Sequence, residues 1–448
     1  MAQCSNLWNI METRNHFKNG ASSKSQMSRE NFLKKVCFIL LMVFVFGSCN
    51  DPKEEIEEKG GKKNNSKISK IDIKNAAALF IAPANSTLKS APANSLNSSI
   101  GQDRLFKITD DGIVEEVSYL DESGNQINEV LIPETIYTIY NSDYFAVKMN
   151  DKFYLVRKSD GAIFVLNTVL GPVNNTARRT GGFLNSDYIV QNPDKSMYLK
   201  NILDQRIYKL DVSNPNSITS TPLTPDTDWA SFWAVSAQGD IFYYNRDNLW
   251  RVRKSNGGYY NIYNNDGFSW TGFDGKIKFF KGSNLCTVNI DENGDVSIEE
   301  KTLNFLSAYA VGPYILRFNN RIIVGDGVCF CEVENESNTP RTINWSYNIQ
   351  NFYKVVNTEN YYYIFGRNSL QGTFIIKIDP TNDALTELLT GENYDIYAMT
   401  VNNNDEVIFN ALRMSDGVKV LGKISSTGNI QIIDEQMNYE TTVLERIQ

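Results

Sequence analysis

The sequence is poor in the side chains that most often carry enzyme chemistry and metal binding. Its 448 residues include one histidine, His16, and six cysteines. We expect the N-terminal segment that contains His16 to be removed, which leaves a chain without histidine. That absence excludes Ser-His-Asp catalysis, Cys-His catalysis and histidine-based metal sites. The sequence also shows no cofactor-binding motif, so we expect neither a cofactor nor a metal.

Basic residues are in the minority. The whole chain carries a net charge of −8. Residues 1–48 hold six basic and two acidic residues, so the rest of the chain keeps 38 basic and 50 acidic residues, a net charge of −12. Binding to nucleic-acid phosphates needs clustered lysine and arginine. The acidic balance therefore argues against a nucleic-acid partner.

Long apolar runs are also missing, with one exception near the N-terminus. Lys34 and Lys35 precede the apolar residues 36–46, and Gly47-Ser48-Cys49 follows. A basic start, a short apolar core and small residues at the end are typical of a secretory signal. A membrane span needs about 20 apolar residues, so this run is too short to cross a bilayer. A short membrane anchor is the alternative.

The motif Phe46-Gly47-Ser48-Cys49 resembles the lipobox of bacterial lipoproteins, although leucine is commoner than phenylalanine at its first position. The resemblance implies cleavage before Cys49 and lipidation of that cysteine. It further implies a membrane-anchored protein of the bacterial cell envelope, and we expect the periplasmic or surface face of an outer membrane. The polar residues before Met27 fit no signal pattern, so Met27 is a candidate for the true start.

Residues 49–103 have the composition of a tether. They are rich in charged residues, Gly, Ser and Asn, and they contain the sequence APANS twice, at 82–86 and 91–95. Such a segment buries too little apolar area to offset the entropy of ordering. The apolar stretch 76–81 is an exception that predicts a short helix or a docked strand. We therefore divide the chain into a signal region (1–48), a tether (49–103) and a folded domain (104–448).

A strand, a polar turn and a second strand recur along the folded domain. Clear copies are 105–112 (LFKITDDG), 153–161 (FYLVRKSDG), 207–212 (IYKLDV), 249–257 (LWRVRKSNG) and 285–294 (LCTVNIDENG), and weaker copies begin at Val328, Thr373 and Lys419. The average spacing is about 45 residues, and Asp-Gly and Asn-Gly favour tight hairpin turns. Two further strands precede most copies.

Four strands in each unit of about 45 residues resemble a β-propeller blade. We predict an all-β propeller with seven blades, or eight as the alternative, in which the half-unit 105–120 completes a blade with strands from elsewhere. The repeats match no WD40, sialidase or kelch signature, so the resemblance implies the fold alone.

Three cysteines remain after Cys49: Cys286, Cys329 and Cys331. Cys329 and Cys331 alternate along one expected strand, where a bridge between them would be strained. Buried free thiols are expected, and a bridge from Cys286 to one of the other two is the alternative. Three thiolates without a fourth ligand do not favour zinc.

One candidate ligand site combines aromatic rings with carboxylates before two inner strands. It consists of Asp226, Asp228, Trp229, Trp233 and Trp270. Inner strands begin near the axial channel of a propeller, and tryptophan faces stack on sugars while carboxylates accept hydroxyl groups. The alternative is that these aromatic rings pack between blades.

Two further motifs have simple structural alternatives. Arg178 and Arg179 precede a Gly-Gly pair and could bind an anion, or they could belong to a solvated loop. The spacing of Asp291, Asn293 and Asp295 resembles part of a calcium loop, but the acid at position twelve is missing. A hairpin turn explains that segment better.

These features favour a lipid-anchored binding or scaffold module for a protein or glycan partner. A carboxylate-dependent enzyme acting on polysaccharide is the first alternative, since such chemistry needs no histidine. A structural subunit of an envelope assembly complex is the second, and it would require an apolar patch on one face.

Overall fold

The computed structural model describes nineteen stretches of the chain. They are residues 68–83, 103–128, 131–139, 142–166, 189–201, 203–204, 206–214, 218–224, 233–244, 250–262, 269–282, 284–303, 314–318, 321–325, 330–335, 340–343, 349–368, 370–435 and 443–447. Every regular element in these stretches is a β-strand, as predicted. Within them, no helix could cross a membrane. The apolar run 36–46 lies outside the described residues.

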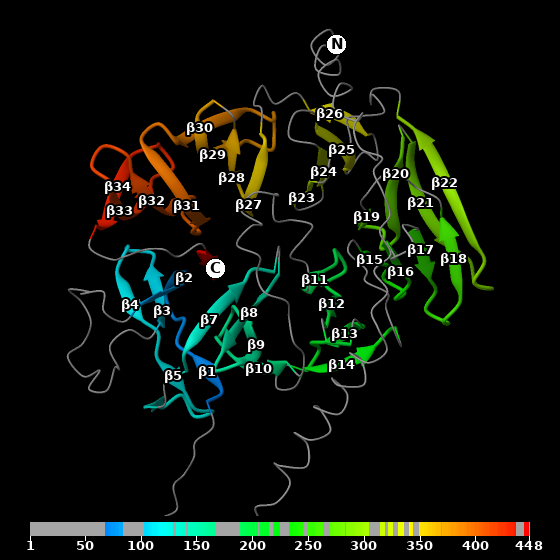
Figure 1. Ribbon diagram of the computed structural model, residues 1–448, viewed down its shortest axis with the longest axis horizontal. Helices are drawn as coiled ribbons and strands as arrows, with labels where there is room; N and C mark the ends of the chain where they lie inside the picture. The colour runs from blue at the N-terminus through cyan, green and yellow to red at the C-terminus, as the bar shows by residue number, and fades with distance from the viewer. Residues whose placement is uncertain are drawn as a thin grey trace, which may run out of the picture. The chain divides into compact units, whose positions relative to one another are not determined.

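Eight four-stranded antiparallel sheets make up the body (Figure 1). Seven of them use strands that are consecutive in the sequence. The first three are β7 (Pro133–Tyr137), β8 (Tyr144–Met149), β9 (Lys152–Arg157) and β10 (Ile163–Leu166); β11 (Ile189–Gln191), β12 (Met197–Lys200), β13 (Ile207–Asp211) and β14 (Thr219–Pro222); and β15 (Trp233–Val235), β16 (Ile241–Tyr244), β17 (Trp250–Arg253) and β18 (Tyr259–Ile262).

The next four sheets follow the same order. They are β19 (Ser269–Thr271), β20 (Ile277–Lys281), β21 (Asn284–Ile290) and β22 (Val296–Thr302); β23 (Tyr314–Phe318), β24 (Arg321–Gly325), β25 (Phe330–Glu334) and β26 (Arg341–Ile343); β27 (Asn351–Asn357), β28 (Tyr362–Asn368), β29 (Gly372–Ile378) and β30 (Leu385–Thr390); and β31 (Tyr394–Val401), β32 (Val407–Arg413), β33 (Val418–Ile424) and β34 (Ile430–Asp434).

The eighth sheet joins the two ends of the described chain. Its order is β35 (Glu445–Arg446), β2 (Ala76–Pro83), β3 (Asp103–Thr109) and β4 (Val114–Glu116). Strand β2 contacts both β7 and β31, so this sheet lies between the first and the last of the other seven. The predicted half-unit is thus completed by strands from elsewhere, and the structure describes eight blades of a β-propeller, the number given as the alternative.

The folded body includes residues before 104, the start that we predicted for it. Residues 76–81, which we expected to be a short helix or a docked strand, lie in β2, and five consecutive residues of that strand, 76–80, are fully buried. The apolar content of this segment is high enough to offset ordering. Residues 84–102 lie outside the described residues.

The strands before β2 and after β4 form a small three-stranded sheet, which we call the β1 extension. Strand β1 (Lys70–Ile71) pairs with β5 (Tyr119–Leu120), which pairs with β6 (Gln126–Ile127). The Ile71 amide donates to the Gly161 carbonyl at 2.9 Å. Gly161 has φ +71°, and a Cβ there would lie 2.0 Å from the Ile71 carbonyl oxygen. Glycine is therefore required where β1 crosses the β9–β10 turn.

The hairpin turns explain a motif that resembled a calcium loop. The Asp291 carboxylate accepts hydrogen bonds from the amides of Asn293 at 2.9 Å and Asp295 at 2.8 Å. Gly294 adopts the left-handed conformation with φ +81°. A side chain that caps its own turn in this way is typical of Asp-initiated turns. The hairpin alternative is confirmed here.

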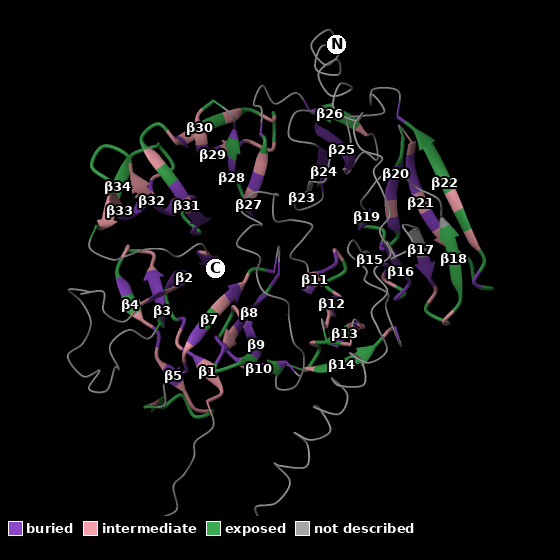
Figure 2. Ribbon diagram, viewed as in Figure 1, coloured by how far each residue is buried: buried purple, intermediate pink, exposed green. Residues whose placement is uncertain are grey.

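The core lies between neighbouring sheets, where the inner strands are buried and the outer strands are exposed (Figure 2). One cluster joins Phe365 and Ile375 of one sheet to Phe409 and Val420 of the next. The Cys286 and Cys331 side chains are buried, and no disulfide joins these two cysteines. Cys329 lies outside the described residues.

Candidate ligand-binding cavity

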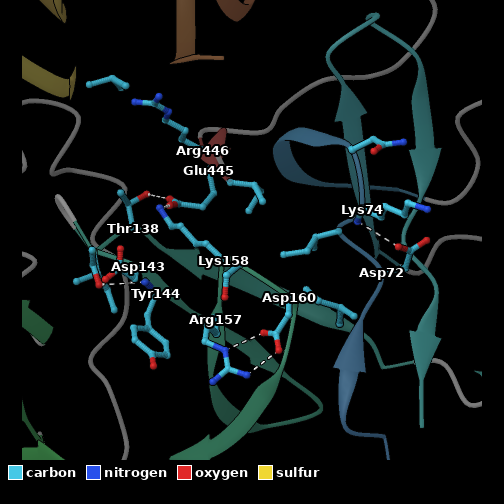
Figure 3. Close-up of a pocket in the computed structure, with 18 of the residues that line it drawn as sticks. Asp72, Lys74, Thr138, Asp143, Tyr144, Arg157, Lys158, Asp160, Glu445 and Arg446 are labelled. Atoms are coloured by element: carbon cyan, nitrogen blue, oxygen red, sulfur yellow. Dashed lines mark hydrogen bonds and ion pairs between the residues drawn. The ribbon is translucent and has the colours of Figure 1, made fainter. Parts of the chain in front are cut away.

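A cavity of about 1060 Å³ lies where three sheets meet the small β1 extension (Figure 3). Its walls come from residues 71–75, residues 138–139 and 142–144 after β7, the turn 157–160 after β9, residues 354–357 of β27, and residues 445–447. Strands β7, β27 and β35 are the first strands of their sheets. In an antiparallel sheet the first and third strands end on the same side, so these segments gather at one end of the sheets.

A buried carboxylate forms the centre of the charged lining. The Glu445 side chain is 1% exposed, and its Oε1 lies 2.7 Å from the Lys158 ammonium. Its Oε2 accepts a hydrogen bond from the Thr138 hydroxyl at 2.5 Å. Figure 3 shows these three side chains converging from β35, the β9–β10 turn and the segment after β7. Because the contacts come from three separate segments, they hold the walls of the cavity together.

Two further cations lie beside Glu445. Lys354 donates from its ammonium to the Leu444 carbonyl. Arg446 donates to the Asn357 carbonyl and, at 3.2 Å, to the side-chain oxygen of Asn403. These acceptors are neutral oxygens. Lys158 contacts the Glu445 carboxylate, and the Glu445 charge also acts on Lys354. The acid whose charge acts on Arg446 is Asp405.

Burial is the main influence on the pKa of Lys354. Burial lowers the pKa of the Lys354 amine to about 8; Glu445 raises it, and the charges of Lys158 and Arg446 lower it. The side chain is surrounded by protein and still contacts the cavity. An anion that enters the cavity would favour the protonated form.

The rim of the cavity carries exposed polar groups. The Arg157 guanidinium donates two hydrogen bonds, of 2.8 and 2.6 Å, to the Asp160 carboxylate. This contact lowers the pKa of the Asp160 carboxyl. Asp72 lies 3.2 Å from the Lys107 ammonium. The Asp143 side chain is largely exposed. The rim can thus both donate and accept hydrogen bonds.

Of the five residues that we predicted to form one aromatic site, the structure describes the side chain of Trp270. Trp270 lies in β19 and is buried, with its ring 5.4 Å from the Phe280 ring. Its Nε1 donates to Glu334 of a neighbouring sheet at 3.2 Å. Trp270 therefore packs between blades, which was the alternative, and it does not line the cavity. Trp233 begins β15, and its side chain is not among those described.

The other predicted site residues lie outside the described residues: Asp226, Asp228, Trp229, Arg178, Arg179 and Cys49. Their roles stay predictions. Sequence reasoning missed Glu445, Lys158 and Lys354. Lys158 belongs to the repeat copy 153–161, where it looks like an ordinary turn residue. Lys354 and Glu445 belong to no motif that the sequence shows. The described residues contain no cluster of three acidic, cysteine or histidine side chains that could hold a metal ion.

Comparisons with solved structures find many with weak similarity. A streptogramin B lyase structure is 16% identical over 67% of this chain and 93% of its own, with a TM-score of 0.37. Dipeptidyl peptidase 4 of Porphyromonas gingivalis is 11% identical over 67% of this chain and 53% of its own, with a TM-score of 0.41. YCF48 bound to D1 peptide is 10% identical over 65% of this chain and 89% of its own, with a TM-score of 0.34.

These similarities carry no argument about what this chain binds or catalyses, because the structures are distant and their functions differ. No family model matches the chain. No curated protein matches it either.

Proposed function

We propose that this protein is a binding module of the bacterial cell envelope, in which the cavity around Glu445 holds part of a glycan or protein partner. The observation that carries the proposal is the cavity itself. It measures about 1060 Å³, is lined by charged and polar side chains from several segments, and lies at one end of the sheets. Ligand sites are commonly concave surfaces with a few converging polar groups.

The acids of the cavity favour binding over glycoside hydrolysis. Hydrolysis of a glycosidic bond needs two carboxyl groups about 5–10 Å apart, one of them able to act as an acid. Glu445 is the buried acid of the lining, and it is held by Lys158 and Thr138. Asp160 is held by Arg157, which lowers the pKa of its carboxyl. The lowered pKa keeps Asp160 ionised, which does not suit a proton donor.

The proposal is tested by blocking the cavity in the full chain. Wild-type protein is titrated by calorimetry with a panel of oligosaccharides and peptides, and the mixtures are assayed for products. Ser159 lies exposed on the cavity wall, so Ser159→Trp should abolish saturable binding of any ligand found. Asn293→Trp, in the exposed β21–β22 turn away from the cavity, is the matched control.

Binding that survives Ser159→Trp would place the ligand site elsewhere on the protein. Formation of products by the wild type would instead favour the enzyme alternative.

The same proposal includes a lipid anchor on Cys49. The support is the order of basic residues, apolar core, small residues and cysteine in the sequence. Stable anchoring needs more than one acyl chain, which lipobox processing would supply. Cys49→Ser should release the protein from the membrane fraction or leave an unprocessed precursor. A variant that fractionates and migrates like the wild type would contradict the anchor.

A further inference from the structure

We infer that residues 443–447 form a strap that opens locally while the neighbouring sheets stay folded, and that a ligand in the cavity holds this strap closed. This inference rests on the proposed function and adds a conformational device to the same site. The strap contains β35, the first strand of the closing sheet, and its residues 445–447 also line the cavity. One segment therefore serves both the closure of the fold and the wall of the site.

The main chain of the strap is paired over a short length. Strand β35 is the shortest of the eight first strands, and its two residues pair with Ala78 and Leu79 of β2. The Ile447 amide also donates to the Ala77 carbonyl at 3.2 Å. Strand β2 pairs with β3 at seven positions that do not involve the strap. The closing sheet can therefore release the strap and remain a sheet of three strands.

The side chains of the strap reach three other sheets. Glu445 contacts the Lys158 ammonium, in the turn after β9, at 2.7 Å, and Figure 3 shows the Lys158 side chain pointing toward it. Arg446 donates to the Asn357 carbonyl of β27, and the charge of Asp405, before β32, acts on its guanidinium. Lys158, Asn357 and both strap residues line the cavity. An occupant of the cavity therefore lies against the contacts that hold the strap.

Opening of the strap has terms of opposite sign. Leu444 and Ile447 are buried in two core clusters and would lose their apolar contacts. Glu445 and Lys158 would regain hydration, because desolvation of a buried ion pair is costly. Local openings of this kind expose less surface than global unfolding and occur at lower free energy. A ligand that needs the complete cavity wall binds the closed state alone and stabilises that state by mass action.

The test of local opening is hydrogen exchange, followed by mass spectrometry on the full-length protein in increasing urea. The wild type is compared with Lys158→Met, which removes the cation that contacts Glu445, and with Arg157→Met. Arg157 is the matched control because it lies in the same turn and lines the same cavity, but forms its ion pair with Asp160. The buried strand β32 reports global unfolding.

In the wild type, exchange of the strap should depend less on urea than exchange of β32, since this dependence scales with the surface exposed on opening. Lys158→Met should speed exchange of the strap roughly tenfold or more relative to β32, and Arg157→Met should leave it near the wild-type rate. Equal urea dependence of the strap and β32, or equal effects of the two variants, would overturn the inference. The wild-type comparison decides local opening even if Lys158→Met does not fold.

The coupling to the cavity is tested with the oligosaccharides and peptides of the binding panel, among them chitohexaose and penta-alanine. A compound that binds in calorimetry should slow exchange of the wild-type strap in proportion to the ratio of its free concentration to Kd. The same compound should have no effect on Ser159→Trp. Binding to the wild type without slower exchange of the strap would overturn the coupling and leave the proposed function standing. If no panel compound binds, the proposed function is wrong and the coupling falls with it, whereas local opening is decided without any ligand.

Discussion

Two groups of charged side chains, most of them buried or partly buried, lie in different parts of this protein. They differ in how their cations are paired with acids. In the first, Arg321 and Arg341 contact Glu332 and Asp383 through four ion pairs of 2.7 to 2.9 Å. Two cations meet two acids there. In the second, at the cavity, Lys158 contacts Glu445 at 2.7 Å and Lys354 donates to the neutral Leu444 carbonyl.

The two groups also differ in what surrounds them. The Arg321 group joins β24, β25 and β26 to the turn after β29, and it connects two sheets that are neighbours in the sequence. The Glu445 group lies on a cavity and joins residues at the C-terminal end of the described chain to Lys158 and Lys354. A buried group with equal numbers of cations and acids satisfies its own charges, whereas the Lys354 ammonium contacts a neutral carbonyl beside a cavity.

Deleting residues 76–83 would break the cavity group most severely. This deletion removes β2, which is buried between β35 and β3 and has Phe80 stacked on Phe106 at 5.5 Å. The closing sheet would lose its second strand, and β35 would lose its partner. We expect the full chain with this deletion to lose cooperative thermal unfolding, followed by circular dichroism. A cooperative transition near the wild-type temperature would contradict the sheet order.

Arg321→Met tests the balanced group. Its loss leaves Glu332, which is 3% exposed, with Arg341 as its remaining cation, and Arg341 is half exposed. Breaking a buried ion pair from one side costs about 3–5 kcal/mol. We expect the free energy of unfolding, measured in urea, to fall by that amount. A change below about 1 kcal/mol would mean that the group is not a structural one.

Lys354→Met tests the group at the cavity. It should have the opposite effect on stability, an increase in the free energy of unfolding. The pKa of Lys354 falls from 10.5 to about 8. A shift of that size corresponds to about 3 kcal/mol that the charged form costs the folded state. Loss of the hydrogen bond to Leu444 offsets about 1 kcal/mol of this. The variant should therefore be more stable than the wild type at pH 7 by about 2 kcal/mol.

The pH dependence of unfolding tests independently whether Lys354→Met is more stable than the wild type. Between pH 8 and about 10.5 the unfolded chain binds a proton at Lys354 that the folded chain has lost. Stability of the wild type therefore rises with pH in this window relative to the variant. Besides burial, the charged groups that act on the pKa of Lys354 are Glu445, Lys158 and Arg446. Urea unfolding at pH 7, 8.5 and 10 should show the advantage of Lys354→Met shrinking, and a constant advantage would contradict the lowered pKa.

Trp270→Phe should have the smallest effect, and it separates packing from ligand binding. The substitution removes the indole donor to Glu334, although Lys278 and the Phe273 amide still donate to that carboxylate. We expect a loss of about 1–2 kcal/mol in stability. Affinity for any cavity ligand should stay unchanged in calorimetry. A large loss of affinity would return Trp270 to the ligand site.

Local patterns predicted much of the fold. Alternating strands, Asp-Gly and Asn-Gly turns and a repeat of about 45 residues gave the four-stranded units, because hairpins form between residues that are close in the sequence. They did not give the partner of the half-unit 105–120. Strand β35 is only two residues long, and its pairing with β2 joins residues more than 360 positions apart. No local signal reports such a pairing.

The site was harder to predict than the fold. Tryptophans beside carboxylates drew attention to 226–233 and 270, but Trp270 is used for packing between sheets. Lys158, Lys354 and Glu445 come from three distant segments and gain their importance by being close together. Burial, charge balance and the lowered pKa of Lys354 are properties of that arrangement. None of them can be assigned to a residue before its neighbours are known.

The sequence by itself determined an all-β chain of repeated hairpin units, an acidic composition and the absence of histidine from residues 17–448, because composition and short-range periodicity suffice for these properties. The tertiary structure alone decided the eighth blade, the inclusion of residues 68–83 in the body, and the cavity around Glu445. These depend on contacts between distant segments, whose energies follow from burial and from the distances between charges in space.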